Sequence, residues 1–61
     1  MPNINVEFIE GRSVEQKRNL ASAMTDAVVE VLGVNREVVR IRFVDIKKHD
    51  VSRGGVLVAD K

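Results

Sequence analysis

The 61 residues can form one small domain, residues 1–61. The chain has no Cys, which excludes disulfides and Cys-based zinc sites. Its single histidine, His49, gives no reason to expect a bound metal. The charges are interspersed, the net charge is +1 and there is no Tyr or Trp, which argues against a nucleic-acid partner. No apolar run reaches the roughly 20 residues of a membrane helix and no secretory signal begins the chain, so we expect a cytoplasmic protein without a membrane partner.

The first predicted element is a half-buried strand over residues 3–9. Apolar and polar side chains alternate along it, which places Ile4, Val6 and Phe8 on one face. The following segment, Glu10-Gly11-Arg12, is a predicted turn.

A helix of about five turns is predicted next. Ser13 and Gln16 have the spacing of a capping box, in which each side chain bonds the backbone of the other residue. Gly33 is positioned to end the helix in the left-handed conformation. Between these signals the apolar residues follow helical spacing: Leu20, Met24, Ala27, Val28, Val31 and Leu32.

A second strand is predicted over residues 38–46. Val39, Ile41 and Phe43 share one face of it, whereas Arg40 and Arg42 share the other. A strand, a long helix and a second strand predict a right-handed crossover between parallel strands. Such a unit leaves sheet edges and one sheet face uncovered, so we expect it to pair with copies of itself.

The C-terminal part also favours association with other copies of the chain. Residues 47–53 predict a polar loop or short turn, Gly54-Gly55 a tight turn, and Val56 to Ala59 a short apolar end that adds a strand to a neighbouring subunit. A chain of this length buries only about 60% of its unfolded surface and is marginal as a monomer. Because 44% of the residues are hydrophobic, a homo-oligomer is the expected route to a stable core.

Four features together resemble one known family. Pro2 opens a strand, Glu10-Gly11-Arg12-Ser13 closes it and caps a helix, a Val-Val-Arg strand centres on Arg40, and Gly54-Gly55 leads a short C-terminal hairpin. The chain is similar over essentially its whole length to the 4-oxalocrotonate tautomerase (2-hydroxymuconate tautomerase) family of the tautomerase superfamily. The resemblance implies an α+β fold, a β-α-β unit with a C-terminal hairpin, in which dimers form a four-stranded sheet and assemble into a hexamer.

The resemblance also implies an activity. Members of the family catalyse keto–enol tautomerisation of unsaturated 2-hydroxy or 2-oxo acids, small carboxylates such as 2-hydroxymuconate from aromatic compound catabolism, and need no cofactor. Met1-Pro2 is a start that the methionine-removing peptidase trims, which leaves proline with a free secondary amine. A free α-amine titrates near about pH 8, so Pro2 is the predicted general base and acid.

Two arginines have implied roles at the site. Arg12 precedes a helix N-terminus, where the dipole disfavours a cation, and such local conflicts are expected at functional sites. By its family position it binds a substrate carboxylate, for which its planar fork is suited. Arg40 is the predicted catalytic cation, acting across a subunit boundary on the developing enolate. The simpler alternatives to these roles are that Arg12 is a solvated loop residue and that Arg40 forms a salt bridge within the strand. Arg42, two residues further on the same face, is the candidate cation if Arg40 is not.

Ile9 and Val51 are the predicted apolar walls of the site. Ile9 matches a lining position of the family, although ordinary packing explains it equally well. Val51 departs from the family, because many members have an aromatic residue three places before the Gly-Gly pair. Two other functions stay open: a proline-based hydratase or dehalogenase, for which Asp50 is the nearest acid, and a non-catalytic oligomeric scaffold.

Overall fold

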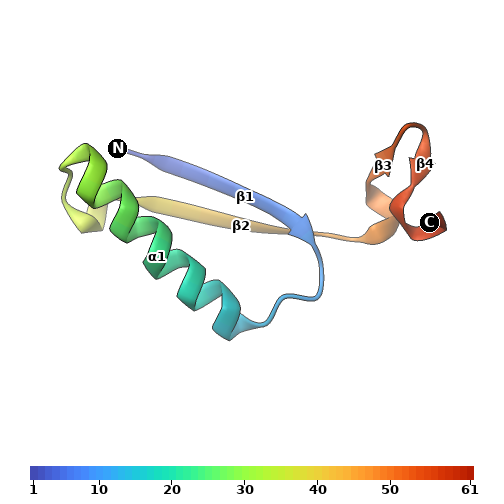
Figure 1. Cartoon of the computed structure of the whole chain (residues 1–61), viewed down its shortest axis with the longest axis horizontal. Helices are drawn as coiled ribbons and strands as arrows, with labels where there is room; N and C mark the ends of the chain where they lie inside the picture. Colours follow the sequence, from blue (N-terminus) through green and yellow to red (C-terminus); the bar gives the residue numbers. More distant parts are fainter.

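A computed structural model describes all 61 residues, and its framework is a β-α-β unit. Strand β1 (Asn3–Ile9) and strand β2 (Arg40–Ile46) form a two-stranded parallel sheet. Helix α1 (Val14–Leu32) connects them and covers one face of the sheet (Figure 1). The predicted parallel crossover is confirmed.

The apolar contacts within the chain lie between the sheet and α1, where the side chains are at most half-buried. The two strands pair in register from Asn3 opposite Arg40 to Ile9 opposite Ile46. Alternation along the strands turns the Phe8 and Phe43 rings toward the helix, where their centroids lie 6.0 Å apart. Lys17 of α1 packs its Nζ atom 5.7 Å from the Phe8 ring and 2.7 Å from the Asp45 carboxylate, which ties the helix to both strands.

Both predicted ends of the helix are confirmed. The Ser13 hydroxyl accepts a hydrogen bond from the Gln16 backbone N–H at 3.1 Å, and the Gln16 side chain accepts one from the Ser13 N–H at 3.0 Å. Gly33 ends the helix with φ 68° and ψ 27°, and its N–H donates to the Val29 carbonyl at 2.9 Å. Local side-chain chemistry therefore sets the length of α1.

The second strand begins two residues later than predicted. Residues Arg36–Val38 form a short 3₁₀ helix, so β2 starts at Arg40 and not at residue 38. The cause is Asn35, whose side chain accepts a hydrogen bond from the Glu37 N–H at 3.1 Å and stabilises a turn where the β-branched residues alone favour a strand.

The C-terminal segment is a hairpin that stands beyond the end of the β1–β2 sheet, apart from α1 (Figure 1). A 3₁₀ helix (Lys48–Asp50) leads into strand β3 (Ser52–Arg53), which pairs antiparallel with β4 (Val56–Leu57). Gly54 and Gly55 have φ values of 61° and 82°, the positive angles that a two-residue hairpin turn requires.

The apolar end over Val56 to Ala59 is a shorter strand than predicted, because only Val56–Leu57 is a strand. It pairs with β3 of its own chain, since the two glycines reverse the backbone, and its addition to a neighbouring subunit stays a prediction. Residues Val58–Asp60 form a final 3₁₀ helix. No helix in the structure is long and apolar enough to cross a membrane.

A single chain does not enclose a core. None of its residues is fully buried, and Val14, Val31, Leu32, Val56 and Leu57 are among the large apolar side chains left exposed. The radius of gyration is 14.7 Å, against roughly 10.5 Å for a compact domain of this length. Apolar surface on this scale requires contact with other copies or another partner.

Candidate active site

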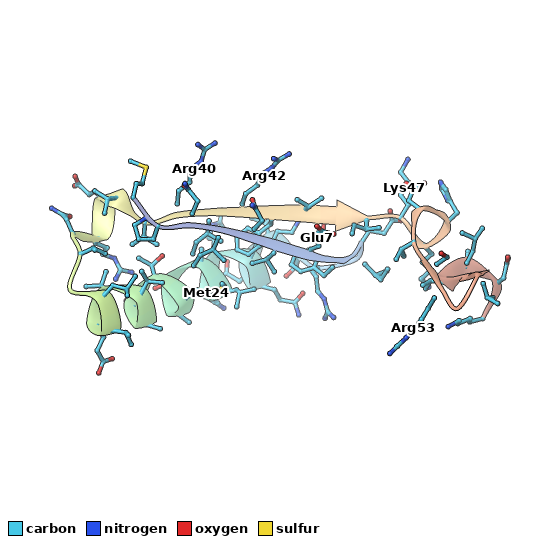
Figure 2. The ribbon with its side chains drawn as sticks, turned by 90° about the horizontal axis from the view of Figure 1, so that it is seen from above. Glu7, Met24, Arg40, Arg42, Lys47 and Arg53 are labelled. Atoms are coloured by element: carbon cyan, nitrogen blue, oxygen red, sulfur yellow. The ribbon has the colours of Figure 1, made fainter.

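The start of the sheet brings Pro2 and Arg40 together. Parallel strands begin at the same edge, and here the Arg40 N–H donates a hydrogen bond to the Pro2 carbonyl at 3.0 Å. Asn3 lies directly opposite Arg40 in the register. The Arg40 side chain projects from the sheet face that α1 does not cover (Figure 2). The predicted base and the predicted cation are therefore neighbours in the backbone of one chain.

Met1 is attached to Pro2 in this structure, so the proline nitrogen is an amide without a basic lone pair. Met1 is 85% exposed, whereas Pro2 is half-buried.

Ile9 and Arg12 lie at the opposite end of β1. Seven residue steps at about 3.3 Å each put Ile9 roughly 23 Å from Pro2. Arg12 follows in the connection to α1 and lines a surface cavity of about 330 Å³ whose floor includes Phe8 and Leu20. One chain therefore does not bring these predicted binding residues to its own Pro2.

Val51 belongs to the same far end. It follows β2 and the 3₁₀ helix, has an extended backbone, and its carbonyl accepts a hydrogen bond from the Val58 N–H at 2.9 Å. The predicted site residues thus form two groups, Pro2 and Arg40 at the start of the strands and Ile9, Arg12 and Val51 at or beyond their ends. Proximity of the two groups requires at least two copies of the chain.

The arginines fall into two classes by their ion pairs. Arg18 pairs with Glu15 at 3.1 Å, and Arg36 pairs with Asp26. The other four have no carboxylate within 4.0 Å: Arg12, Arg40, Arg42 and Arg53. Arg40 has no acidic partner in the chain, which argues against the alternative that it forms a structural salt bridge. Its guanidinium is therefore available for an anionic ligand.

Two further polar residues lie beside Arg40 that the sequence did not single out. Asn3 and Asn5 share its sheet face and, with Arg42 and Ile4, line a cavity of about 270 Å³. The strict alternation of residues 3–7 was the signal that could have identified them. No three His, Asp or Glu side chains gather where they could hold a metal ion.

A short β-α-β unit with a C-terminal hairpin, opened by proline, defines the tautomerase fold. Residues 2–61 match the family model described as tautomerase enzyme, and the chain belongs to this family. A protein of Staphylococcus aureus (strain Mu50) named probable tautomerase is 39% identical over 61 residues, 100% of each chain. The chain is therefore a tautomerase-family enzyme, an isomerase.

Solved structures of tautomerases have the same fold as this chain. The crystal structure of YwhB, a homologue of 4-oxalocrotonate tautomerase, matches with a TM-score of 0.93 at 33% identity over 98% of each chain. A heterohexamer 4-oxalocrotonate tautomerase from Chloroflexus aurantiacus J-10-fl matches with a TM-score of 0.89 at 30% identity, over 98% of this chain and 97% of that one. The fold and the family expected from the sequence are confirmed.

Proposed function

We propose that the chain is a cofactor-independent isomerase that interconverts the enol and keto forms of an unsaturated 2-hydroxy or 2-oxo acid resembling 2-hydroxymuconate. The observation that carries the proposal is the position of Pro2, which begins β1 and is hydrogen-bonded through its carbonyl to Arg40, an arginine without an acidic partner. A base and an unpaired cation at one edge of a sheet suit proton transfer next to a developing oxyanion.

The proton transfer proceeds in two balanced steps once Met1 is removed. The Pro2 amine accepts the proton of the substrate's enol hydroxyl, and the O–H electron pair becomes part of a C=O bond. The diene electrons shift to a distant carbon, which then takes the proton from the proline ammonium. Proline ends as it began, and the net change is a proton moved from oxygen to carbon.

The other site residues act on the substrate without exchanging protons. Arg40 stabilises the negative charge on the 2-oxygen and the adjacent carboxylate. Arg12 binds a remote carboxylate through its planar fork, and Ile9 and Val51 supply apolar walls that keep water from the reacting atoms. Because Ile9, Arg12 and Val51 lie at the end of the strands far from Pro2, neighbouring copies contribute these three residues to each Pro2.

We further propose that the working form is a homohexamer, a trimer of dimers in which each dimer has a four-stranded sheet. The exposed apolar side chains and the open edges of the β1–β2 sheet support association. Sedimentation equilibrium of the purified chain is expected to give a mass about six times 6.8 kDa. A folded monomer that persists at micromolar concentration would contradict this assembly.

The direct test of the proposed reaction uses 2-hydroxymuconate as substrate. The protein is first checked by mass spectrometry of its N-terminus, so that the trimmed form is known to be present. We expect the ultraviolet absorbance of the dienol to decay faster with trimmed protein than in buffer alone. A trimmed, assembled protein that leaves this rate and the rates of related 2-hydroxydienoates unchanged would rule out the proposed activity and favour the scaffold.

The hydratase or dehalogenase alternative has less support from the chain. It needs a carboxylate at the C-terminal loop to activate water. The nearest acid, Asp50, is exposed and lies 3.6 Å from the Nε2 atom of His49. The residue closer to the glycine turn is a cation, Arg53, which does not activate water as a base.

A further inference from the structure

The C-terminal hairpin carries an arginine to which the proposed reaction gives no role. Arg53 is the last residue of β3 and stands directly opposite Val56 of β4, which is 45% exposed. The backbone of Val51, two residues before Arg53, is extended, with φ −139° and ψ 135°. Successive side chains of an extended segment alternate between its faces, and directly opposite residues share a face. Arg53 therefore lies on one face of the hairpin with the apolar side chains of Val51 and Val56.

The backbone of the hairpin fixes Arg53 relative to Val51. The Val51 carbonyl accepts a hydrogen bond from the Val58 N–H at 2.9 Å, and the two glycines close the turn directly after Arg53 with positive φ angles. Two residue steps along the strand set the backbones of Val51 and Arg53 roughly 7 Å apart. Figure 2 shows Arg53 projecting to the side of the sheet on which α1 lies, whereas the two arginines of β2 project to the other side. Arg53 is thus separate from the arginines of the sheet.

No acid of the chain neutralises Arg53. The residue is exposed, and no carboxylate lies within 4.0 Å of its guanidinium. Asp50, the acid closest to it in sequence, lies instead 3.6 Å from the Nε2 atom of His49. When another copy covers the exposed Val56, Arg53 on the same face is also drawn away from water. Burial of an unpaired cation is costly, so Arg53 requires an anion from outside its own chain.

We propose that Arg53 is a further substrate-binding residue, which holds the carboxylate remote from the enol and makes the enzyme select substrates with two carboxylates over substrates with one. The inference rests on the proposed function, in which Val51 is an apolar wall beside the Pro2 of a neighbouring copy. A wall made by Val51 brings Arg53 with it, because the two side chains share a face. The guanidinium fork suits a carboxylate, whose roughly four lone-pair sites leave room for Arg53 beside Arg12.

Binding of two unreactive acids tests this role without turnover. Muconate and sorbate have the same carbon chain and double bonds, but sorbate has a methyl group in place of the second carboxylate, and neither has an enol hydroxyl. We expect calorimetry on the trimmed, assembled protein to show tighter binding of muconate. Arg53→Gln should weaken muconate binding about tenfold, the usual effect of losing a charged hydrogen bond, and leave sorbate binding unchanged. Binding of neither acid, or an unchanged muconate-to-sorbate ratio in the variant, would overturn the proposal.

Two further variants separate a direct contact from general attraction of anions. Arg53→Lys keeps the charge but loses the fork, so it should recover part of the muconate affinity. Lys48→Gln is the matched control, since Lys48 is also exposed and has no carboxylate within 4.0 Å but lies on the 3₁₀ helix before the hairpin. It should leave the muconate-to-sorbate ratio unchanged. Equal losses in the Lys48 and Arg53 variants would contradict a defined contact. A smaller sedimentation mass of Arg53→Gln with an unchanged ratio would also contradict it, and would assign Arg53 to a carboxylate of a neighbouring copy.

Kinetics on 2-hydroxymuconate separates this inference from the proposed reaction. Arg53→Gln should raise KM about tenfold and leave kcat nearly unchanged, because the remote carboxylate has the same charge in the ground state and the transition state. Turnover of 2-hydroxymuconate with an unchanged muconate-to-sorbate ratio in Arg53→Gln would overturn the role of Arg53 and leave the reaction standing. Absence of turnover together with muconate binding that depends on Arg53 would refute the reaction and leave the binding role standing.

Discussion

Replacing Pro2 by alanine is expected to lower the rate of tautomerisation by about 10²–10⁴-fold, the usual contribution of a positioned general base. Alanine keeps an amine after trimming of Met1, but a primary amine has different basicity and more freedom. The fold should persist, because the contact of residue 2 with β2 is made by its carbonyl, which accepts from the Arg40 N–H and is present in any residue. Steady-state kinetics on 2-hydroxymuconate measures the loss.

A chain that retains Met1 is the matched test of the same group. Its Pro2 nitrogen is an amide and cannot accept a proton, so turnover should fall at least as far as in Pro2→Ala. Circular dichroism and sedimentation serve as controls that both proteins are folded and assembled. Should the untrimmed protein turn over substrate at the trimmed rate, proline would not be the base.

Replacing Arg40 by alanine should lower kcat by about 10²–10³-fold, as removal of a group that stabilises an oxyanion does in other enzymes. Its charge interacts more strongly with the enolate-like transition state than with the ground state, and the low polarity of an enclosed site strengthens that interaction. Arg12→Ala should instead mainly raise KM, because the remote carboxylate is present in both states.

Arg40→Lys provides the control, since it keeps the charge and loses the fork and should recover part of kcat. The outcome that would contradict the assignment is specific. If Arg40→Ala changes neither kcat nor KM while Arg42→Ala abolishes turnover, Arg42 is the catalytic cation. The catalytic group would then stand opposite Asn5 and not beside the Pro2 carbonyl.

The parts of the fold that the sequence predicts well are those fixed by neighbouring residues. Ser13, Gln16 and Gly33 determine the helix ends through contacts within a few residues, and these predictions are confirmed. The start of β2 was wrong by two residues because one side-chain hydrogen bond, from the Glu37 N–H to Asn35, outweighs the strand preference of the following valines. The C-terminal hairpin, which the resemblance implied and the Gly54-Gly55 turn favoured, is confirmed by the antiparallel pairing of β3 with β4.

The candidate site is predictable only in part for a different reason. The sequence pattern predicts the parallel crossover, but the sequence analysis expected Arg40 to act across a subunit boundary and did not foresee that its backbone bonds Pro2 of the same chain. The relation of Pro2 to Ile9, Arg12 and Val51 depends on contacts between copies, which no local pattern encodes. The roles of these five residues remain predictions that the kinetic variants test.

The exposed Met1 side chain has a consequence for the order of events in the cell. In the proposed assembly, residues from neighbouring copies close around Pro2, and a methionine still attached there would occupy the space that the substrate must enter. Met1 is 85% exposed in the single chain. If the proposed assembly closes around Pro2, we expect Met1 to be removed faster before the chain associates than afterwards, so a chain that associates early would keep an inactive site.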